Sequence, residues 1–173
     1  MQTSTPIDRK AIYAALAAPF PEDTVQRTWS EDHMGPGGNT IKGTRRGYDT
    51  TGIGYQHVVN RLNDVLGVGG YRVERKVTTE SGSTNAGKDK HVVHCEIKLQ
   101  LGEWVGGAWV PFAEAVADGG HESRSLADAI KGAYTNGFKK AAAFFGVGRE
   151  AYEGTLDDDN VPADTAKDRS GSR

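Results

Sequence analysis

The segment 91–101 alternates strictly between two kinds of side chain, and this pattern constrains the fold more than any other feature of the chain. One set, apolar except for its first member, comprises His91, Val93, Cys95, Ile97, Leu99 and Leu101. The other set, mostly polar, comprises Val92, His94, Glu96, Lys98 and Gln100. Because successive side chains of a strand point to opposite faces, the pattern predicts a β-strand with one buried face.

Two further strand candidates flank this segment, at residues 71–79 and 108–118. A stretch rich in glycine, serine and asparagine at 81–90 predicts a long hairpin loop before the central strand, and Gly106-Gly107 predicts a tight turn after it. Since only one face of each strand needs burial, an antiparallel meander is the most economical arrangement.

The strongest helix signal follows, at residues 125–145. Ser125 with Asp128 three residues later is typical of a capping box, and Gly146 is placed to end the helix. An apolar and small-residue stripe recurs every three or four positions, at Leu126, Ile130, Ala133, Gly137, Ala141 and Phe144. Its small members would let the helix backbone lie close to the sheet.

The N-terminal part predicts two more helices. The first spans 7–17, with Thr5 as its N-cap, and the second spans 51–66. Residues 25–29 favour a short strand, and Gly35-Pro36-Gly37-Gly38 favours a loop or hairpin tip. The expected fold class is therefore α+β: a three-stranded antiparallel β-meander packed with a long C-terminal helix (a β-β-β-α core), plus N-terminal helices.

The 173 residues suit one domain, which we place at 1–150, followed by a disordered acidic tail at 151–173. A single cysteine excludes an internal disulfide and favours a reducing compartment. No apolar run approaches the ~18–20 residues of a membrane span, and the first ten residues lack the apolar core of a signal peptide. We therefore expect a cytoplasmic protein with no membrane contact.

Charge is distributed unevenly although the formal net charge is only −2. Segment 42–76 holds seven basic and three acidic residues, and the last predicted helix carries Lys131, Lys139 and Lys140. Cations spaced along a surface are what the backbone of a single-stranded nucleic acid requires. The same surface would also suit a protein-interaction scaffold that binds acidic partners, and both hypotheses stay open at this point.

Catalytic chemistry finds less support in the sequence. His91 and His94 are three residues apart on one strand, so they point to opposite faces, and Cys95 belongs to the apolar face. The chain lacks a loop ending in Gly-Lys-Ser/Thr, so no nucleotide cofactor is expected. The remaining enzymatic alternative is a metal-dependent nuclease or phosphodiesterase that uses His94, Glu96 and His121.

Three segments together resemble the single-strand annealing proteins of the Rad-fifty-two type. They are GYQHVVNRLNDVLG at 54–67, AEAVADGG at 113–120, and the pair SLADAIKGA and GFKKAAAFFG at 125–133 and 137–146. LAAPFP at 16–21, with Trp29, further resembles the bacterial branch, DNA-damage-response protein A and its phage relatives.

The resemblance implies a homo-oligomeric ring of β-β-β-α protomers, with single-stranded DNA in a basic groove. It also implies protection and annealing of complementary strands in recombination and repair, without nucleotide hydrolysis or any cofactor, on the nucleoid. Lys139 and Lys140 match the basic pair that lines the groove in the family, and His57 falls where the family has an early basic residue. From charge placement alone we add Arg45, Arg46, Arg61 and Lys131 to the predicted DNA-binding residues. The acidic tail is predicted to compete with DNA or to dock partner proteins.

Overall fold

A computed structural model describes residues 8–29, 31–43, 50–83 and 87–151. The chain divides into two compact units, one made of Met1–Ala18 and Val58–Val147 and the other of Pro19–His57 and Gly148–Arg173. The described helices and strands are α1 (Arg9–Leu16), β1 (Val25–Thr28), β2 (His33–Met34), β3 (Thr40–Ile41), β4 (Thr50–Ile53), α2 (Tyr55–Leu66), β5 (Tyr71–Ser83), β6 (Asp89–Val105), β7 (Ala108–Ser123) and α3 (Leu126–Ala143). Short 3-10 turns lie at Glu22–Thr24, Pro36–Gly38 and Arg149–Ala151.

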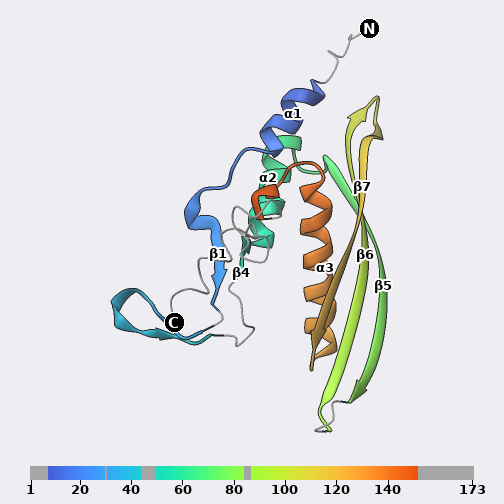
Figure 1. The fold of residues 1–173 in the computed structure, drawn as a ribbon. Helices are drawn as coiled ribbons and strands as arrows, with labels where there is room; N and C mark the ends of the chain where they lie inside the picture. Colours follow the sequence, from blue (N-terminus) through green and yellow to red (C-terminus); the bar gives the residue numbers. More distant parts are fainter. Residues whose placement is uncertain (1–7, 30, 44–49, 84–86, 152–173) are drawn as a thin grey trace, which may run out of the picture. The chain divides into compact units, whose positions relative to one another are not determined.

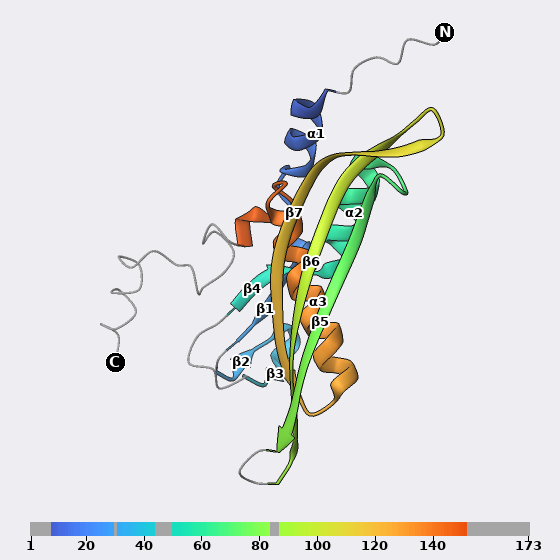
Figure 2. The same cartoon turned by 90° about the vertical axis from the view of Figure 1, so that its right-hand side faces the viewer.

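The first unit is built on an antiparallel sheet with the strand order β5-β6-β7. Figure 2 shows the three long strands side by side, with α3 behind them. Residue Lys98 of β6 lies opposite Glu74 of β5 and Val116 of β7, so these three side chains share one face of the sheet. Between Leu101 and Gly102 the register with β7 shifts by one residue, which gives β7 a bulge.

Helix α3 covers the other face of the sheet, along β6 and β7 (Figure 1). The alternation of β6 places its odd-numbered side chains there, and these are fully buried: Val93, Cys95, Ile97, Leu99 and Leu101. Small residues of α3 make the close approach possible, since Ala133, Gly137 and Ala141 are buried in the contact. The core of the unit therefore consists of the apolar side chains of β6, packed against the small residues of α3.

The face of the sheet opposite α3, called the outer face below, is highly charged. Its side chains pair across the strands: Lys98 with Glu74 at 2.8 Å, Lys90 with Glu122 at 2.9 Å and His94 with Asp118 at 3.4 Å. Its basic members between residues 72 and 122 are Arg72, Lys76, Lys90 and Lys98, and its acidic members are Glu74, Glu80, Glu96, Glu114, Asp118 and Glu122. Acidic groups outnumber basic ones on this face, which disfavours a phosphate backbone there.

The second unit contains two small antiparallel pairs, β1 with β4 and β2 with β3. The β2–β3 hairpin turns through Pro36–Gly38, where Gly37 adopts a φ of 79° that favours glycine. Ile53 at the end of β4 is buried, and the backbone nitrogen of Phe20 donates to a Glu150 carboxylate oxygen at 3.2 Å. These contacts join the segment after α1 to the one after α3.

The predicted α+β class, the meander and the long helix are confirmed, as are the short strand near residue 25 and the hairpin tip at Gly35–Gly38. Ser125 is the N-cap of α3, and its side chain accepts a hydrogen bond from the Asp128 backbone nitrogen. The strands are longer than predicted: β5 continues to Ser83, β6 spans Asp89–Val105, and β7 continues to Ser123. The predicted loop at 81–90 is therefore wrong at both of its ends, where residues 81–83 pair with residues 89–91.

Two expectations about element boundaries and one about burial are wrong. Helix α1 starts at Arg9 with Asp8 as its N-cap, whereas the predicted cap, Thr5, lies outside the described residues. Helix α2 starts at Tyr55, because residues 50–53 pair with β1 as strand β4 instead of extending the helix. The ends of the predicted α3 stripe are exposed, since Phe144 retains 72% and Leu126 40% of its accessible surface.

No helix in the described segments is long and apolar enough to cross a membrane.

Candidate nucleic-acid interface

The predicted basic pair lies in the C-terminal half of α3. Lys140 is exposed and Lys139 is half-buried. Adjacent residues of a helix point about 100° apart, so the two ammonium groups are presented to different directions around one turn. The backbone that carries them is fixed by the close packing of α3 on the sheet and by the Ser125 cap at its start.

Hydrogen bonding on α3 shows which way Lys140 points. Asn136, one turn earlier on the same side of the helix, donates its side-chain amide to the Gly120 carbonyl oxygen of β7 at 3.0 Å. Lys140 therefore lies on the β7 flank of α3. Within the described residues it has no ion-pair partner, so its charge is available to a ligand.

Lys131 lies on the opposite flank of the same helix. Positions nine residues apart differ by about half a turn, so Lys131 and Lys140 face away from each other. The neighbour of Lys131 one turn along is Tyr134, whose ring lies 5.7 Å from the Arg75 guanidinium of β5. Lys139 and Lys140 are therefore neighbours on α3 that point in different directions, and Lys131 lies with the β5 flank.

Arg61 makes defined protein contacts. Its Nη1 donates to the carbonyl oxygens of Ala15 and Leu16, at 3.4 and 3.3 Å, and to that of Ala18. These carbonyls are at the C-terminal end of α1, where backbone carbonyl groups have no N–H donor within the helix and a nearby cation is favourable. This contact accounts for Arg61 structurally, and its predicted DNA contact stays a prediction.

The other basic residues predicted as a stripe over 42–76 do not form one continuous surface. Lys42 pairs with Asp32 at 2.7 Å in the second unit. Arg75 and Lys76 are consecutive in β5 and so point to opposite faces of the sheet. His57 is half-buried near the start of α2, and Arg45 and Arg46 lie outside the described residues.

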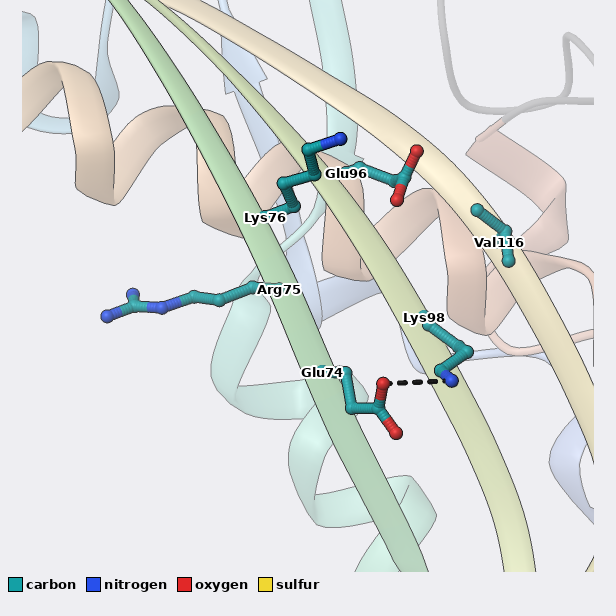
Figure 3. Close-up of a pocket in the computed structure, with 6 residues that line it drawn as sticks. All are labelled: Glu74, Arg75, Lys76, Glu96, Lys98 and Val116. Atoms are coloured by element: carbon teal, nitrogen blue, oxygen red, sulfur yellow. Dashed lines mark ion pairs between the residues drawn. The ribbon is translucent and has the colours of Figure 1, made fainter.

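A shallow hollow on the sheet illustrates the mixed charge of the outer face. It is lined by Glu74, Arg75, Lys76, Glu96, Lys98 and Val116. Figure 3 shows the Glu74–Lys98 ion pair within it and the Arg75 side chain pointing away from the other residues. The hydrogen bond that Lys98 donates to the Glu74 carboxylate raises the pKa of Lys98 above its ordinary value. Because Lys98 is already paired with Glu74, it is a weak candidate for a phosphate contact.

The residues of the enzymatic alternative are not brought together. His94 and Glu96 lie on the outer face, whereas His121 lies opposite Val93 on the face that packs against α3. The His121 ring occupies the space that a Cβ on Gly132 of α3 would need. The described residues contain no group of three or more His, Cys, Asp or Glu side chains placed to hold a metal ion.

Cys95 is a packed core residue, as predicted. Its side chain is fully buried on the α3 face of β6, and this burial raises the pKa of the thiol above its ordinary value. A thiol that stays protonated is a poor nucleophile.

Sequence analysis missed a set of arginine–aromatic contacts at one end of the sheet. The Arg72 guanidinium lies 4.3 Å from the Trp109 ring and 5.9 Å from the Trp104 ring, and that of Arg9 lies 5.5 Å from the Phe112 ring. The signal in the sequence was Trp104 and Trp109 placed symmetrically about the Gly106-Gly107 turn, which makes them cross-strand partners.

The sequence matches a family of known proteins. The family model described as Rad52/22 family double-strand break repair protein matches residues 9–166, which is most of the chain and reaches into the predicted tail. Among curated proteins, none matches this sequence. The bacterial or phage branch stays a prediction.

Proposed function

The chain belongs to the Rad52/22 family of double-strand break repair proteins, and from that premise we propose that it binds single-stranded DNA through Lys139 and Lys140 of α3. We propose further that it protects the bound strand and anneals it to its complement without ATP, as a homo-oligomeric ring on the nucleoid. It acts by binding, not by bond cleavage.

The observation that carries this proposal is the position of the basic pair. Lys139 and Lys140 are adjacent residues of α3, whose backbone is fixed against the sheet. Lys140 is exposed on the β7 flank of the helix. Two adjacent cations on a fixed helix backbone can contact neighbouring phosphates and release their counterions. The acidic outer face would in turn repel the same strand.

A ring would give Lys131 a role that a single protomer does not. In a head-to-tail assembly each protomer presents different surfaces to its two neighbours. We propose that the β7 flank of one α3, with Lys140, faces the β5 flank of the next, with Lys131. His57, Arg45 and Arg46 stay predicted DNA-binding residues, and we propose that the acidic tail docks partner proteins.

Annealing follows from contacts of this kind. Phosphates held by lysines leave the bases unpaired and accessible, so a second strand can test its register repeatedly before it pairs. Because no covalent bond is made or broken, strand pairing supplies the free energy and no nucleotide is consumed.

The test is the salt dependence of binding to a labelled oligonucleotide, followed by fluorescence anisotropy. In the variant Lys139→Ala/Lys140→Ala, two phosphate contacts are lost. The magnitude of the slope of log affinity against log salt should therefore fall by about 1.4, and binding at low salt should weaken. The control, Lys76→Ala/Lys98→Ala, makes the same change in net charge on the outer face and should keep the parent slope. Equal slopes in the parent and both variants would refute the site. Equal losses of affinity in both variants would show that binding depends on net charge and not on the position of Lys139 and Lys140.

The same preparations address annealing and assembly. Complementary labelled strands should pair faster with the parent protein than alone, without ATP, and each strand should stay intact in magnesium or manganese. Cleavage of the strand would favour the nuclease alternative. Light scattering should give a mass of several protomers; a monomer that still anneals would contradict the ring.

A further inference from the structure

An aromatic side chain is exposed at the C-terminal end of α3, one turn beyond Lys140. Phe144, the C-cap of the helix, retains 72% of its accessible surface, whereas the next residue, Phe145, is buried. A single exposed apolar side chain is common on protein surfaces, so exposure alone assigns no role to the ring. The position of Phe144 relative to Lys140 carries the inference.

Phe144 and Lys140 lie on the same flank of α3. The φ and ψ of Phe144 are −61° and −25°, so the helical geometry continues through this residue. Helical residues four positions apart are neighbours, with Cβ atoms about 5–6 Å apart. The Phe144 side chain therefore lies one turn from that of Lys140 on the β7 flank, and both are exposed.

The backbone that carries Phe144 is held by a hydrogen-bonded helix end. The Val147 backbone nitrogen donates to the Ala142 carbonyl oxygen at 3.2 Å, and Gly146 adopts a φ of 93°. A left-handed glycine with this hydrogen bond is the arrangement of a Schellman C-cap. Val147 is buried, and a Cβ on Gly146 would lie 2.6 Å from Cβ of Ala17 after α1, so the turn is closely packed. An exposed ring on such a fixed backbone loses little conformational freedom when a ligand binds.

We propose that Phe144 is a stacking site for an unpaired base of the single strand whose phosphate is held by Lys140. This inference rests on the proposed function and adds a base contact to its phosphate contacts. A nucleotide carries a negative phosphate and a flat base, and Lys140 and Phe144 present a cation and a flat ring one turn apart. Every base has a face that can stack on an aromatic ring, so this contact does not depend on sequence.

The helix dipole favours a base over a phosphate at Phe144. The C-terminal end of a helix carries partial negative charge, because its peptide dipoles are aligned. A phosphate would be repelled at the last residue of the helix, whereas an uncharged base would not. Lys140 supplies the positive charge of the last turn, so the favourable place for the phosphate is at its ammonium group.

The charge of Lys140 favours a single strand over a second copy of this chain as the ligand of the ring. Lysine is depleted at the cores of protein interfaces, because burying its ammonium group without a partner is costly. A second copy that covered Phe144 would bring Lys140 into the same interface, and within the described residues Lys140 has no ion-pair partner. A single strand satisfies both groups, since each nucleotide offers a phosphate to the ammonium group and a base to the ring.

The experiment measures binding of a poly-dT oligonucleotide to full-chain variants by fluorescence anisotropy. Loss of one stacked base should weaken binding of Phe144→Ala about tenfold, while the salt slope stays that of the parent because stacking releases no counterions. Phe144→Leu keeps the apolar bulk without the ring and should lose nearly as much affinity, whereas Phe144→Tyr keeps the ring and should bind like the parent. On an abasic oligonucleotide of equal length, the parent and Phe144→Ala should bind alike.

The matched control is Leu126→Ala, which removes an exposed apolar side chain at the other end of α3. Its affinity for poly-dT should equal that of the parent. An equal loss of affinity in Leu126→Ala and Phe144→Ala would refute a local role for the ring.

The remaining outcomes separate this inference from the proposed function. Parent-like binding of Phe144→Ala or Phe144→Leu to poly-dT, with the effect of Lys139→Ala/Lys140→Ala intact, would overturn the stacking site alone. Equal losses of Phe144→Ala on poly-dT and on the abasic strand would also overturn it. A parent protein that does not bind poly-dT would overturn both the stacking site and the proposed function. A change of oligomeric mass in Phe144→Ala without loss of DNA affinity per protomer would assign the ring to contact between copies and refute its role in stacking.

Discussion

Gly119 of β7 and Gly137 of α3 pack backbone against backbone. A Cβ on Gly137 would lie 3.1 Å from the Gly119 nitrogen and 2.8 Å from Cγ1 of Ile97, and a Cβ on Gly119 would overlap the backbone of Ala133 and Gly137. The two glycines therefore set the distance between helix and sheet, and with it the position of every residue that α3 presents.

The first prediction concerns this contact. Gly119→Ala should lower the free energy of unfolding by about 1–3 kcal/mol or more, because the added methyl meets backbone atoms that cannot rotate away. Urea denaturation followed by circular dichroism measures the change. The matched control is Gly120→Ala, whose Cβ would have its nearest neighbour at 4.0 Å. Equal stability of the two variants would show that α3 does not pack this closely.

Patterns with a short repeat were sufficient to predict the elements that carry the fold. The alternation around Cys95 and the capping signal at Ser125 depend only on neighbouring residues, so β6 and α3 could be placed from sequence. The β4 strand was missed because its partner, β1, lies far away in the sequence. Local propensity contains no information about such a pairing.

The candidate site was predicted less completely for a similar reason. Helical spacing places Lys139 beside Lys140, but it does not show that Arg61 is engaged at the end of α1. Nor does local sequence show that Arg72 lies against Trp109, since strand register creates that contact. Charge counted along the chain therefore overstates the cations available to a ligand.

The second prediction separates the two roles of Arg61. Arg61→Met keeps the aliphatic stem but removes the donors to the end of α1, so it should cost about 1–3 kcal/mol of stability. Thermal or urea unfolding measures this loss. If Arg61 serves only the end of α1, the salt slope of DNA binding stays that of the parent. A slope lowered by about 0.7 with unchanged stability would instead identify Arg61 as a phosphate contact.

The third prediction tests the start of α3. Ser125→Ala removes the acceptor for the Asp128 backbone nitrogen, 3.3 Å away, and should destabilise the protein by about 1 kcal/mol. Ser125→Asp restores an acceptor and adds a favourable negative charge at the helix N-terminus, so it should recover the loss. Denaturation midpoints provide the measurement. A similar loss of stability in both variants would show that the Ser125 hydroxyl does not stabilise α3 as an N-cap.

The fourth prediction concerns Cys95, whose pKa is raised by burial above the ordinary value of 9.0, with a smaller opposing effect from Arg75. The folded thiol therefore holds its proton at pH values where the unfolded thiol has lost it. This group's stabilisation is complete below pH 9 and is lost as the pH rises through the folded pKa.

Two measurements follow for Cys95. A thiol reagent at pH 8 should modify the native protein far more slowly than the urea-unfolded protein, because the buried side chain reacts only after opening. Above pH 9, the stability of the parent should fall relative to Cys95→Ala, by at most about 1.4 kcal/mol per pH unit, because the variant has no thiol to titrate. Parallel stability curves for parent and variant, with rapid modification of the native protein, would show that Cys95 is solvated and that β6 is not packed under α3.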